Sequence, residues 1–178
     1  MITRRDLTLG VLLTPAALAF ARSAFGEEEK VEEALGLPDE LNTSQLIYLT
    51  PIKSDGEESK CKAEIWFGFH NNEIYVVTPA TAWRSEAIRK KLTSTRIWVG
   101  DFGNWQRANE KFREAPELMA TGSIVEDEEV HAEVLEVMGK KYTREWGRWG
   151  PQFKSALEDG TRVMIKYTPE KSEKDVEA

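Results

Sequence analysis

The stretch "KAEIWFGFHNNEIYVVT", residues 62–78, has the pattern of two β-strands joined by a tight turn. Its first part, residues 62–70, alternates between apolar and other side chains, as expected of a strand with one buried face. Asparagines at 71 and 72 tolerate the positive φ angles of a hairpin turn, and residues 74–78 form an apolar returning strand. The apolar face of the first strand carries Ala63, Ile65, Phe67 and Phe69.

Strand and helix patterns follow on both sides of this hairpin. Helix 127–142 has acidic residues in its first turn and lysines in its last, as the helix dipole favours. The elements show no regular βαβ alternation, which favours a mainly β (α+β) fold: about six strands in an antiparallel sheet or barrel with two or three peripheral helices. The other predicted strands are 44–52, 95–102, 117–126 and 162–169, and the other predicted helices are 27–37 and 82–92.

Residues 1–26 have the composition of an export leader. Arg4 and Arg5 precede an apolar run of about 14 residues, shorter than the roughly 20 that a membrane-spanning helix needs. Small residues follow at positions that fit a cleavage site, and "TRRDL" (3–7) resembles the twin-arginine export motif. We therefore expect an exported protein, periplasmic or extracellular, without a membrane span after cleavage. The ordinary secretory route and an uncleaved anchor are the alternatives.

The remaining chain divides into a helical lead-in (27–43), one domain (44–169) and a flexible charged tail (170–178). Since the leader carries three arginines and one aspartate, its removal changes the formal net charge from −7 to −9. Such an acidic chain repels phosphate backbones, so nucleic-acid binding is not expected. The single Cys61 and two histidines form no metal-ligand pattern, and no nucleophile elbow, P-loop or GxGxxG is present.

The order and spacing of the elements resemble those of a known family. The segments that carry this resemblance are "EIWFGFHNNEIYVVT", "PATAWRSEAIRKKL", "TRIWVGDF", "ELMATGSIVED" and "RVMIKYTP". Over residues 44–169 the chain resembles the flavin-binding split β-barrel superfamily of pyridoxamine-phosphate oxidase-like proteins, which includes flavin and deazaflavin (F420) reductases. The resemblance implies a six-stranded split barrel, a homodimer, and FMN as cofactor with F420 or haem as alternatives. The family's usual asparagine-leucine pair and following proline are absent here.

The resemblance also implies site residues. Lys62, Thr78 and Arg84 match the family's phosphate-binding positions; Trp83 and Arg89 are further candidates for cofactor binding. Chemistry supports Arg84 independently: a cation in the first turn of a helix is unfavourable unless an anion lies nearby, and an arginine fork grips phosphate well. For each residue an ordinary surface or packing role is the alternative.

Three functions remain open from the sequence. The first is an exported flavin-dependent oxidoreductase that acts on a small molecule, in which the cofactor supplies the chemistry and no catalytic side-chain constellation is required. The second is a non-catalytic flavin or haem binding or storage protein of the same fold. The third is a cofactor-free β-barrel protein that binds an apolar ligand.

Overall fold

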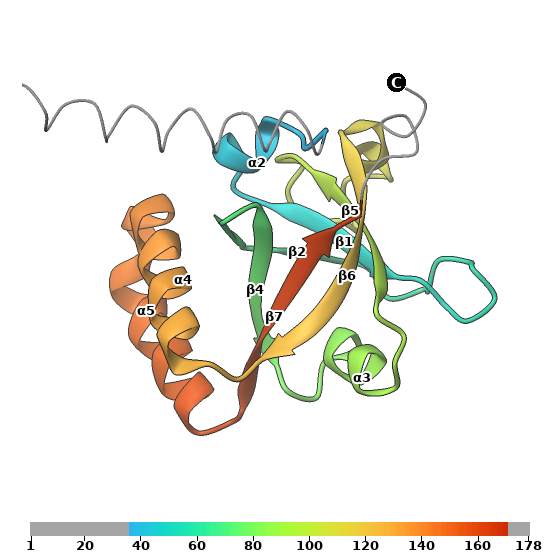
Figure 1. The fold of residues 1–178 in the computed structure, drawn as a ribbon. Helices are drawn as coiled ribbons and strands as arrows, with labels where there is room; N and C mark the ends of the chain where they lie inside the picture. The colour runs from blue at the N-terminus through green and yellow to red at the C-terminus, as the bar shows by residue number, and fades with distance from the viewer. Residues whose placement is uncertain (1–35, 171–178) are drawn as a thin grey trace, which may run out of the picture.

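A computed structural model describes residues 36–170 of the chain. Its seven strands curl into a half-open barrel, with a pair of long helices on one side and a short helix below (Figure 1). In chain order the elements are α2 (Glu40–Thr43), β1 (Ile47–Pro51), β2 (Ala63–Ile65), β3 (Gly68–His70), β4 (Glu73–Pro79), α3 (Trp83–Arg89), β5 (Ser94–Val99), the 3₁₀ turn η1 (Lys111–Glu114), β6 (Glu117–Val125), α4 (Glu128–Lys141), α5 (Thr143–Glu158) and β7 (Arg162–Pro169).

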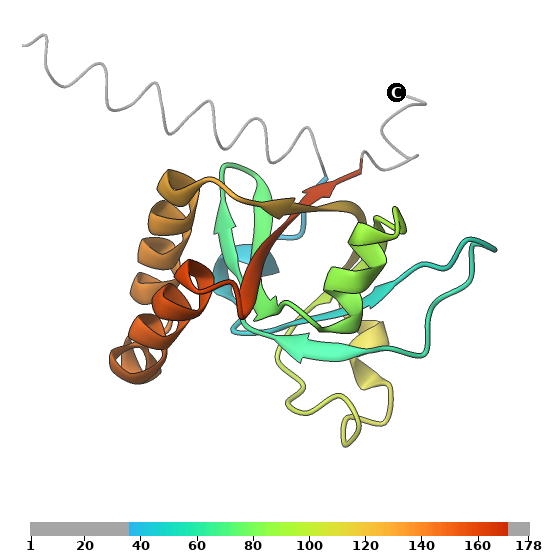
Figure 2. The same cartoon turned by 90° about the horizontal axis from the view of Figure 1, so that it is seen from below.

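All strand pairs are antiparallel, in the order β2-β1-β5-β6-β7-β4-β3. The two outer strands of this sheet, β2 and β3, are consecutive in the chain, so residues 66–67 connect the two edges without a hydrogen-bonded ladder between them. Figure 2, which views the molecule from below, shows the sheet wrapped around the interior of the barrel. The mainly β split-barrel fold expected from the sequence is confirmed, with β1 and β4–β7 at the predicted places.

The prediction of one strand over residues 62–70 is wrong in one respect. In the structure this segment is broken at Trp66 and Phe67 into two strands, β2 and β3. This raises the strand number from six to seven. The backbone of Phe67 is held by the Tyr142 hydroxyl, which accepts from its N–H at 2.9 Å and lies 3.0 Å from its carbonyl. That oxygen also lies 2.9 Å from the carbonyl of Gln45. A side chain thus replaces ladder partners at the barrel seam.

The hairpin turn between β3 and β4 is as predicted. Asn71 and Asn72 have φ angles of 52° and 59°, in the left-handed region that asparagine tolerates. The helix predicted over 82–92 is shorter than expected. It ends at Arg89, and Lys91 has a φ of 64°, which stops a regular helix.

Helix α5 is absent from the prediction, which left residues 143–161, between the helix 127–142 and the strand 162–169, without secondary structure. Pro151 and two glycines lie inside this helix, and such residues normally indicate a turn. Packing explains the glycines in part: a Cβ added at Gly139 of α4 or Gly150 of α5 would lie 2.7 Å from Nε1 of Trp146. The Trp146 indole therefore fills a space that side chains at these two positions would block.

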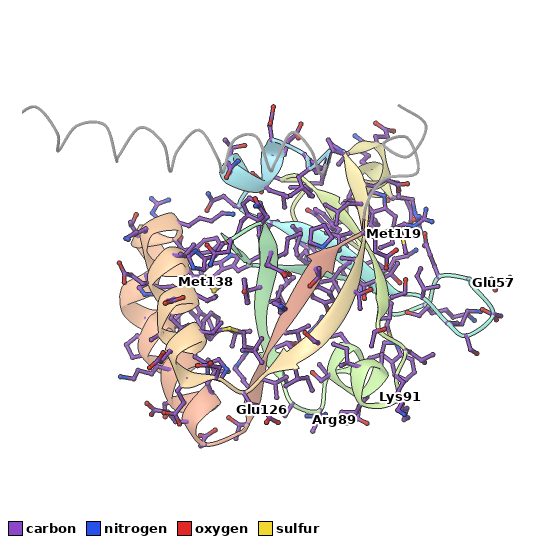
Figure 3. The ribbon with its side chains drawn as sticks, viewed as in Figure 1. Glu57, Arg89, Lys91, Met119, Glu126 and Met138 are labelled. Atoms are coloured by element: carbon purple, nitrogen blue, oxygen red, sulfur yellow. The ribbon has the colours of Figure 1, made fainter. Side chains whose placement is uncertain are left out.

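The apolar interior has three parts. One fills the barrel, one lies between the sheet and the α4–α5 pair, where Met138 is labelled in Figure 3, and one lies under the loop that carries η1. The fully buried side chains at their centres include Phe67, Ile97, Met138, Met164 and Phe112. Within residues 36–170, no helix is both long and apolar enough to cross a bilayer.

The predicted signal peptide (1–26) and most of the predicted helix 27–37 lie outside the described residues, as does the predicted tail from 171 onward. Glu170 is still attached to the sheet, since its N–H donates to the Met119 carbonyl at 2.8 Å. Its carboxylate accepts a hydrogen bond from Thr121 at 3.0 Å.

Candidate functional site

The barrel is open where strands β2 and β4 separate. Strand β3 pairs with β4 only from His70–Glu73 to Gly68–Tyr75, and β2 turns away to pair with β1. From Val76 onward, β4 pairs only with β7 among the described strands. The gap between β2 and the end of β4 is bordered by side chains rather than by a hydrogen-bonded ladder, and the first turn of α3 faces it.

Arg84 lies in this gap. Its Nη1 donates a hydrogen bond to Oγ1 of Thr78, a side chain that is fully buried at the end of β4. In the described part of the chain no carboxylate forms an ion pair with Arg84. Burial lowers the pKa of Arg84 from its ordinary value, yet a guanidinium keeps its charge in proteins. The site therefore holds a half-buried cation without a counter-charge.

Arg84 lines a first open cavity, named cavity A, of about 410 Å³. It contains a second arginine, Arg162, at the start of β7, whose guanidinium carbon lies 5.3 Å from the Phe153 ring. The strand register places Arg162 opposite Pro79, one residue past Thr78. The full lining is Leu46, Glu64, Ile65, Trp66, Val77, Thr78, Pro79, Arg84, Trp149, Phe153 and Arg162.

Cavity A combines cationic and aromatic groups. The carboxylate of Glu64, the acid in the lining, accepts hydrogen bonds from the Asn104 side chain at 2.9 Å and the Trp105 N–H at 3.2 Å. Trp66 stacks on Tyr142 with ring centroids 4.4 Å apart, and Trp149 lies tilted against Phe153. The cavity thus offers two arginines and a hydroxyl beside flat apolar surfaces.

A second cavity, named cavity B, has a volume of about 290 Å³ and shares Arg84 with cavity A. Lys62 lies here, with its Nζ 3.1 Å from Oε1 of Glu110. Trp83, which is 40% exposed, also borders it, and Lys90 lies 5.8 Å from the centroid of that ring. The full lining is Leu49, Pro51, Lys60, Cys61, Lys62, Ala63, Trp83, Arg84 and Trp105.

The five predicted site residues are therefore only partly brought together. Thr78 and Arg84 meet at cavity A, whereas Lys62 and Trp83 meet Arg84 at cavity B. Arg89 lines neither cavity and lies at the outer end of α3 (Figure 3). Its Nη1 donates to the Ala80 carbonyl at 2.6 Å and pairs with Glu86 at 3.0 Å, so it secures the loop before the helix.

Arg162 was absent from the predicted site, as were the aromatic walls of cavity A. The sequence gives little signal for Arg162, because only the β4–β7 register brings it beside Thr78. Trp66 offered a clearer signal: it is a large aromatic residue on the otherwise polar face of a predicted strand, the kind of position that an interface or flat ligand uses.

Neither histidine lies at these cavities. His131 Nε2 lies 2.9 Å from the Val125 carbonyl, and His70 Nε2 lies 3.5 Å from a carboxylate oxygen of Glu133. Among residues 36–170, no group of three or more histidine, cysteine or acidic side chains is arranged to hold a metal ion.

Comparison with known proteins gives matches in structure and none in sequence. No family model matches the chain, and no curated protein matches it significantly. The heme storage protein HutZ from Vibrio cholerae has a TM-score of 0.52 at 14% identity, with 82% of this chain and 91% of that chain covered. The conserved hypothetical protein Rv2991 from Mycobacterium tuberculosis has a TM-score of 0.51 at 19% identity, covering 76% and 77%.

Campylobacter jejuni ChuZ is similar to the same degree, with a TM-score of 0.51 at 13% identity, covering 88% of this chain and 60% of that chain. At these identities the likeness shows the architecture and leaves ligand and activity open. The chain has the split β-barrel fold, with the α4–α5 pair packed on one side of it.

Proposed function

We propose that this chain binds a phosphorylated flavin, FMN, in cavity A and is an exported flavin-dependent oxidoreductase that acts on a small molecule. The observation that carries the proposal is Arg84, a half-buried cation with no carboxylate partner among the described residues, hydrogen-bonded to the buried hydroxyl of Thr78. A phosphate would supply the missing negative charge. Arg162 is the second cation for it.

The aromatic side of cavity A fits the ring system of such a cofactor. Trp66, Trp149 and Phe153 line it together with aliphatic side chains, and flat aromatic surfaces favour stacking and edge contacts with a planar ligand. A bound flavin supplies hydride or electron transfer. The protein's own part is then to hold the phosphate, orient the ring and keep water away from it. F420 also pairs a flavin-like ring with a phosphate and is the alternative within this proposal.

Haem is the competing cofactor, because HutZ is described as a heme storage protein. A haem iron needs an axial imidazole, thiolate, thioether or phenolate. The residues that line cavity A include no histidine, cysteine, methionine or tyrosine. The donor set that this chain presents there therefore favours a phosphorylated flavin over haem.

The proposal includes a homodimer and export. Cavity A is open, and its rim carries the half-buried indoles of Trp66 and Trp149, which a second subunit would cover. A monomeric mass at micromolar concentration with cofactor bound would contradict the dimer. Replacement of Arg4 and Arg5 by lysine should hold the precursor in the cytoplasm; unchanged export would contradict the twin-arginine leader.

An absorbance spectrum of the protein after loading with FMN, F420 or haemin in separate samples tests the cofactor. We expect stoichiometric retention of FMN through gel filtration, and reduction of the bound flavin by a nicotinamide or deazaflavin donor. Retention of haemin with a sharp Soret band, and no retention of FMN, would refute the flavin proposal. Retained FMN that no donor reduces would leave a binding protein in place of an enzyme.

A further inference from the structure

Cavity B has a composition that the flavin site does not require. Three cations line it, Lys60, Lys62 and Arg84, and no carboxylate does. This contrasts with the chain as a whole, whose formal net charge is −7. In an acidic protein, a cavity with only basic charged side chains in its lining is a local reversal of sign, which favours an anionic ligand.

The three cations differ in how far they are already neutralised. Lys62 is bound by Glu110, and the same carboxylate is bound by Arg113. Lys60 is exposed and, within residues 36–170, forms no ion pair. Arg84 likewise has no carboxylate partner there. Two unneutralised cations therefore border the same cavity, one on the β1–β2 connection and one on α3.

Two indoles complete the lining. Trp83 belongs to α3 and Trp105 to the loop before η1, so the aromatic surface comes from segments far apart in the chain. Trp83 is one of two large apolar side chains that the described surface leaves exposed. Indole faces are good stacking surfaces for a heteroaromatic ring, whatever its substituents.

We propose that cavity B is a second ligand subsite, for a flat heteroaromatic group that carries a phosphate. Lys60 and Arg84 would bind the anion, and Trp83 and Trp105 the ring. Two sources share this chemistry. One is the adenylate part of a dinucleotide flavin, whose first phosphate would contact Arg84 from cavity A. This first source rests on the proposed function. The other is a separate nucleotide, whose binding does not depend on the proposed function.

Cys61 provides a local reporter. It is the single cysteine of the chain, it is exposed, and it lines cavity B. The rate at which a thiol reagent modifies it should fall when the cavity is occupied. We would measure this rate with riboflavin, FMN, FAD and AMP, and with AMP added to protein already saturated with FMN, all at constant ionic strength.

The proposal predicts at least fivefold slower modification of Cys61 with FAD, or with AMP added to the FMN-saturated protein, than with FMN alone. If FAD protects Cys61 and AMP does not, the ligand is the adenylate part of a dinucleotide flavin. If AMP protects Cys61, the ligand is a separate nucleotide. Trp83→Ala and Lys60→Ala should abolish the protection. Phe102→Ala, which changes the other exposed large apolar side chain, and Lys53→Ala, whose lysine pairs with Asp55 and Glu57, should retain it.

Equal rates with FMN, FAD and AMP would overturn the proposal, as would protection by inorganic phosphate equal to that by AMP. Protection that survives both Trp83→Ala and Lys60→Ala would also overturn it. The flavin proposal fails separately, because FMN retention is read from its absorbance and not from Cys61.

Discussion

Replacing Arg84 by alanine should weaken the binding of FMN and leave the binding of riboflavin almost unchanged. In the structure, Arg84 has no carboxylate partner within residues 36–170, and its described side-chain hydrogen bond goes to Thr78. Its charge is therefore available to a ligand. Riboflavin has the same ring system as FMN but no phosphate, so the difference between the two ligands isolates the contact with the phosphate.

The expected size follows from a charge-assisted hydrogen bond, about 1.5–3 kcal/mol, which corresponds to roughly ten- to a hundredfold in Kd. Arg84→Lys should recover part of the loss, since lysine keeps the charge without the fork. The assay is titration of apo protein with each ligand, followed by quenching of flavin fluorescence. Arg89→Ala is the matched control: it removes an arginine of the same helix that lines neither cavity, and it should bind FMN as the wild type does.

The apo protein should tolerate the loss of this charge. Burial without a counter-charge lowers the pKa of Arg84, which means that the folded state disfavours its cationic form. Arg84→Met, which keeps most of the side-chain volume, relieves this cost but also removes the hydrogen bond to the buried Thr78 hydroxyl, so it should unfold at nearly the same temperature without ligand. The reasoning is refuted if Arg84→Ala weakens FMN and riboflavin equally, or neither, while the protein remains folded.

Four further substitutions test the packing that supports the site and the burial of Lys141. Gly139→Ala should destabilise the protein by about 1–3 kcal/mol in urea unfolding, because its Cβ would lie 2.7 Å from the Trp146 indole nitrogen. Gly147→Ala, with nothing within 4 Å of the added atom, should instead be neutral or stabilising by up to about 1 kcal/mol; equal effects of both would contradict this packing. Tyr142→Phe should cost about 1–3 kcal/mol in the same assay, since it leaves buried backbone groups at the seam without a partner; an unchanged midpoint would show that the seam does not depend on the hydroxyl. Burial lowers the pKa of Lys141 to about 8, so as the pH rises the folded state releases this proton before the unfolded state does. The free energy of unfolding of the wild type relative to Lys141→Met should therefore rise between pH 8 and about 10.5. A difference that stays constant with pH would contradict the shift.

Local patterns predicted much of the fold. The hairpin at Asn71 and Asn72 and the strands on either side of it follow from turn chemistry and alternation, which depend on neighbouring residues only. The break at Trp66 and Phe67 could not be predicted in this way. Ile65, Phe67 and Phe69 all still pack on the barrel interior, so the alternation continues through the break. The backbone at the break is instead hydrogen-bonded to Tyr142, a residue far along the chain.

Helix α5 was missed for the opposite reason, because its local signals are misleading. Pro151 and the nearby glycines indicate a turn, and only the packing of Trp146 between two helices explains why glycine is needed at position 150.

The site divides in the same manner. Arg84 could be predicted, because a cation in the first turn of a helix is locally unfavourable and so indicates a partner outside the helix. Arg162 could not, since its place beside Thr78 depends on the pairing of β4 with β7. The family resemblance also implied one phosphate site for Lys62 and Thr78. In the structure Thr78 lines cavity A and Lys62 lines cavity B, and Arg84 lines both.

The tyrosine at the seam has a consequence for how the barrel is made. Tyr142 lies 75 residues after Phe67 and 97 after Gln45, and contacts between residues so distant form only after a large loss of chain entropy. A chain that is still being synthesised and has not reached residue 142 cannot hold the junction of β2 and β3 beside Gln45 in this way, and it also lacks β7, which lies between β6 and β4 in the sheet. Until β7 is made, the edges of β4 and β6 that pair with it stay unpaired, and such edges are templates for association with other chains. Truncation before α4 should therefore yield an aggregating fragment in place of a smaller barrel.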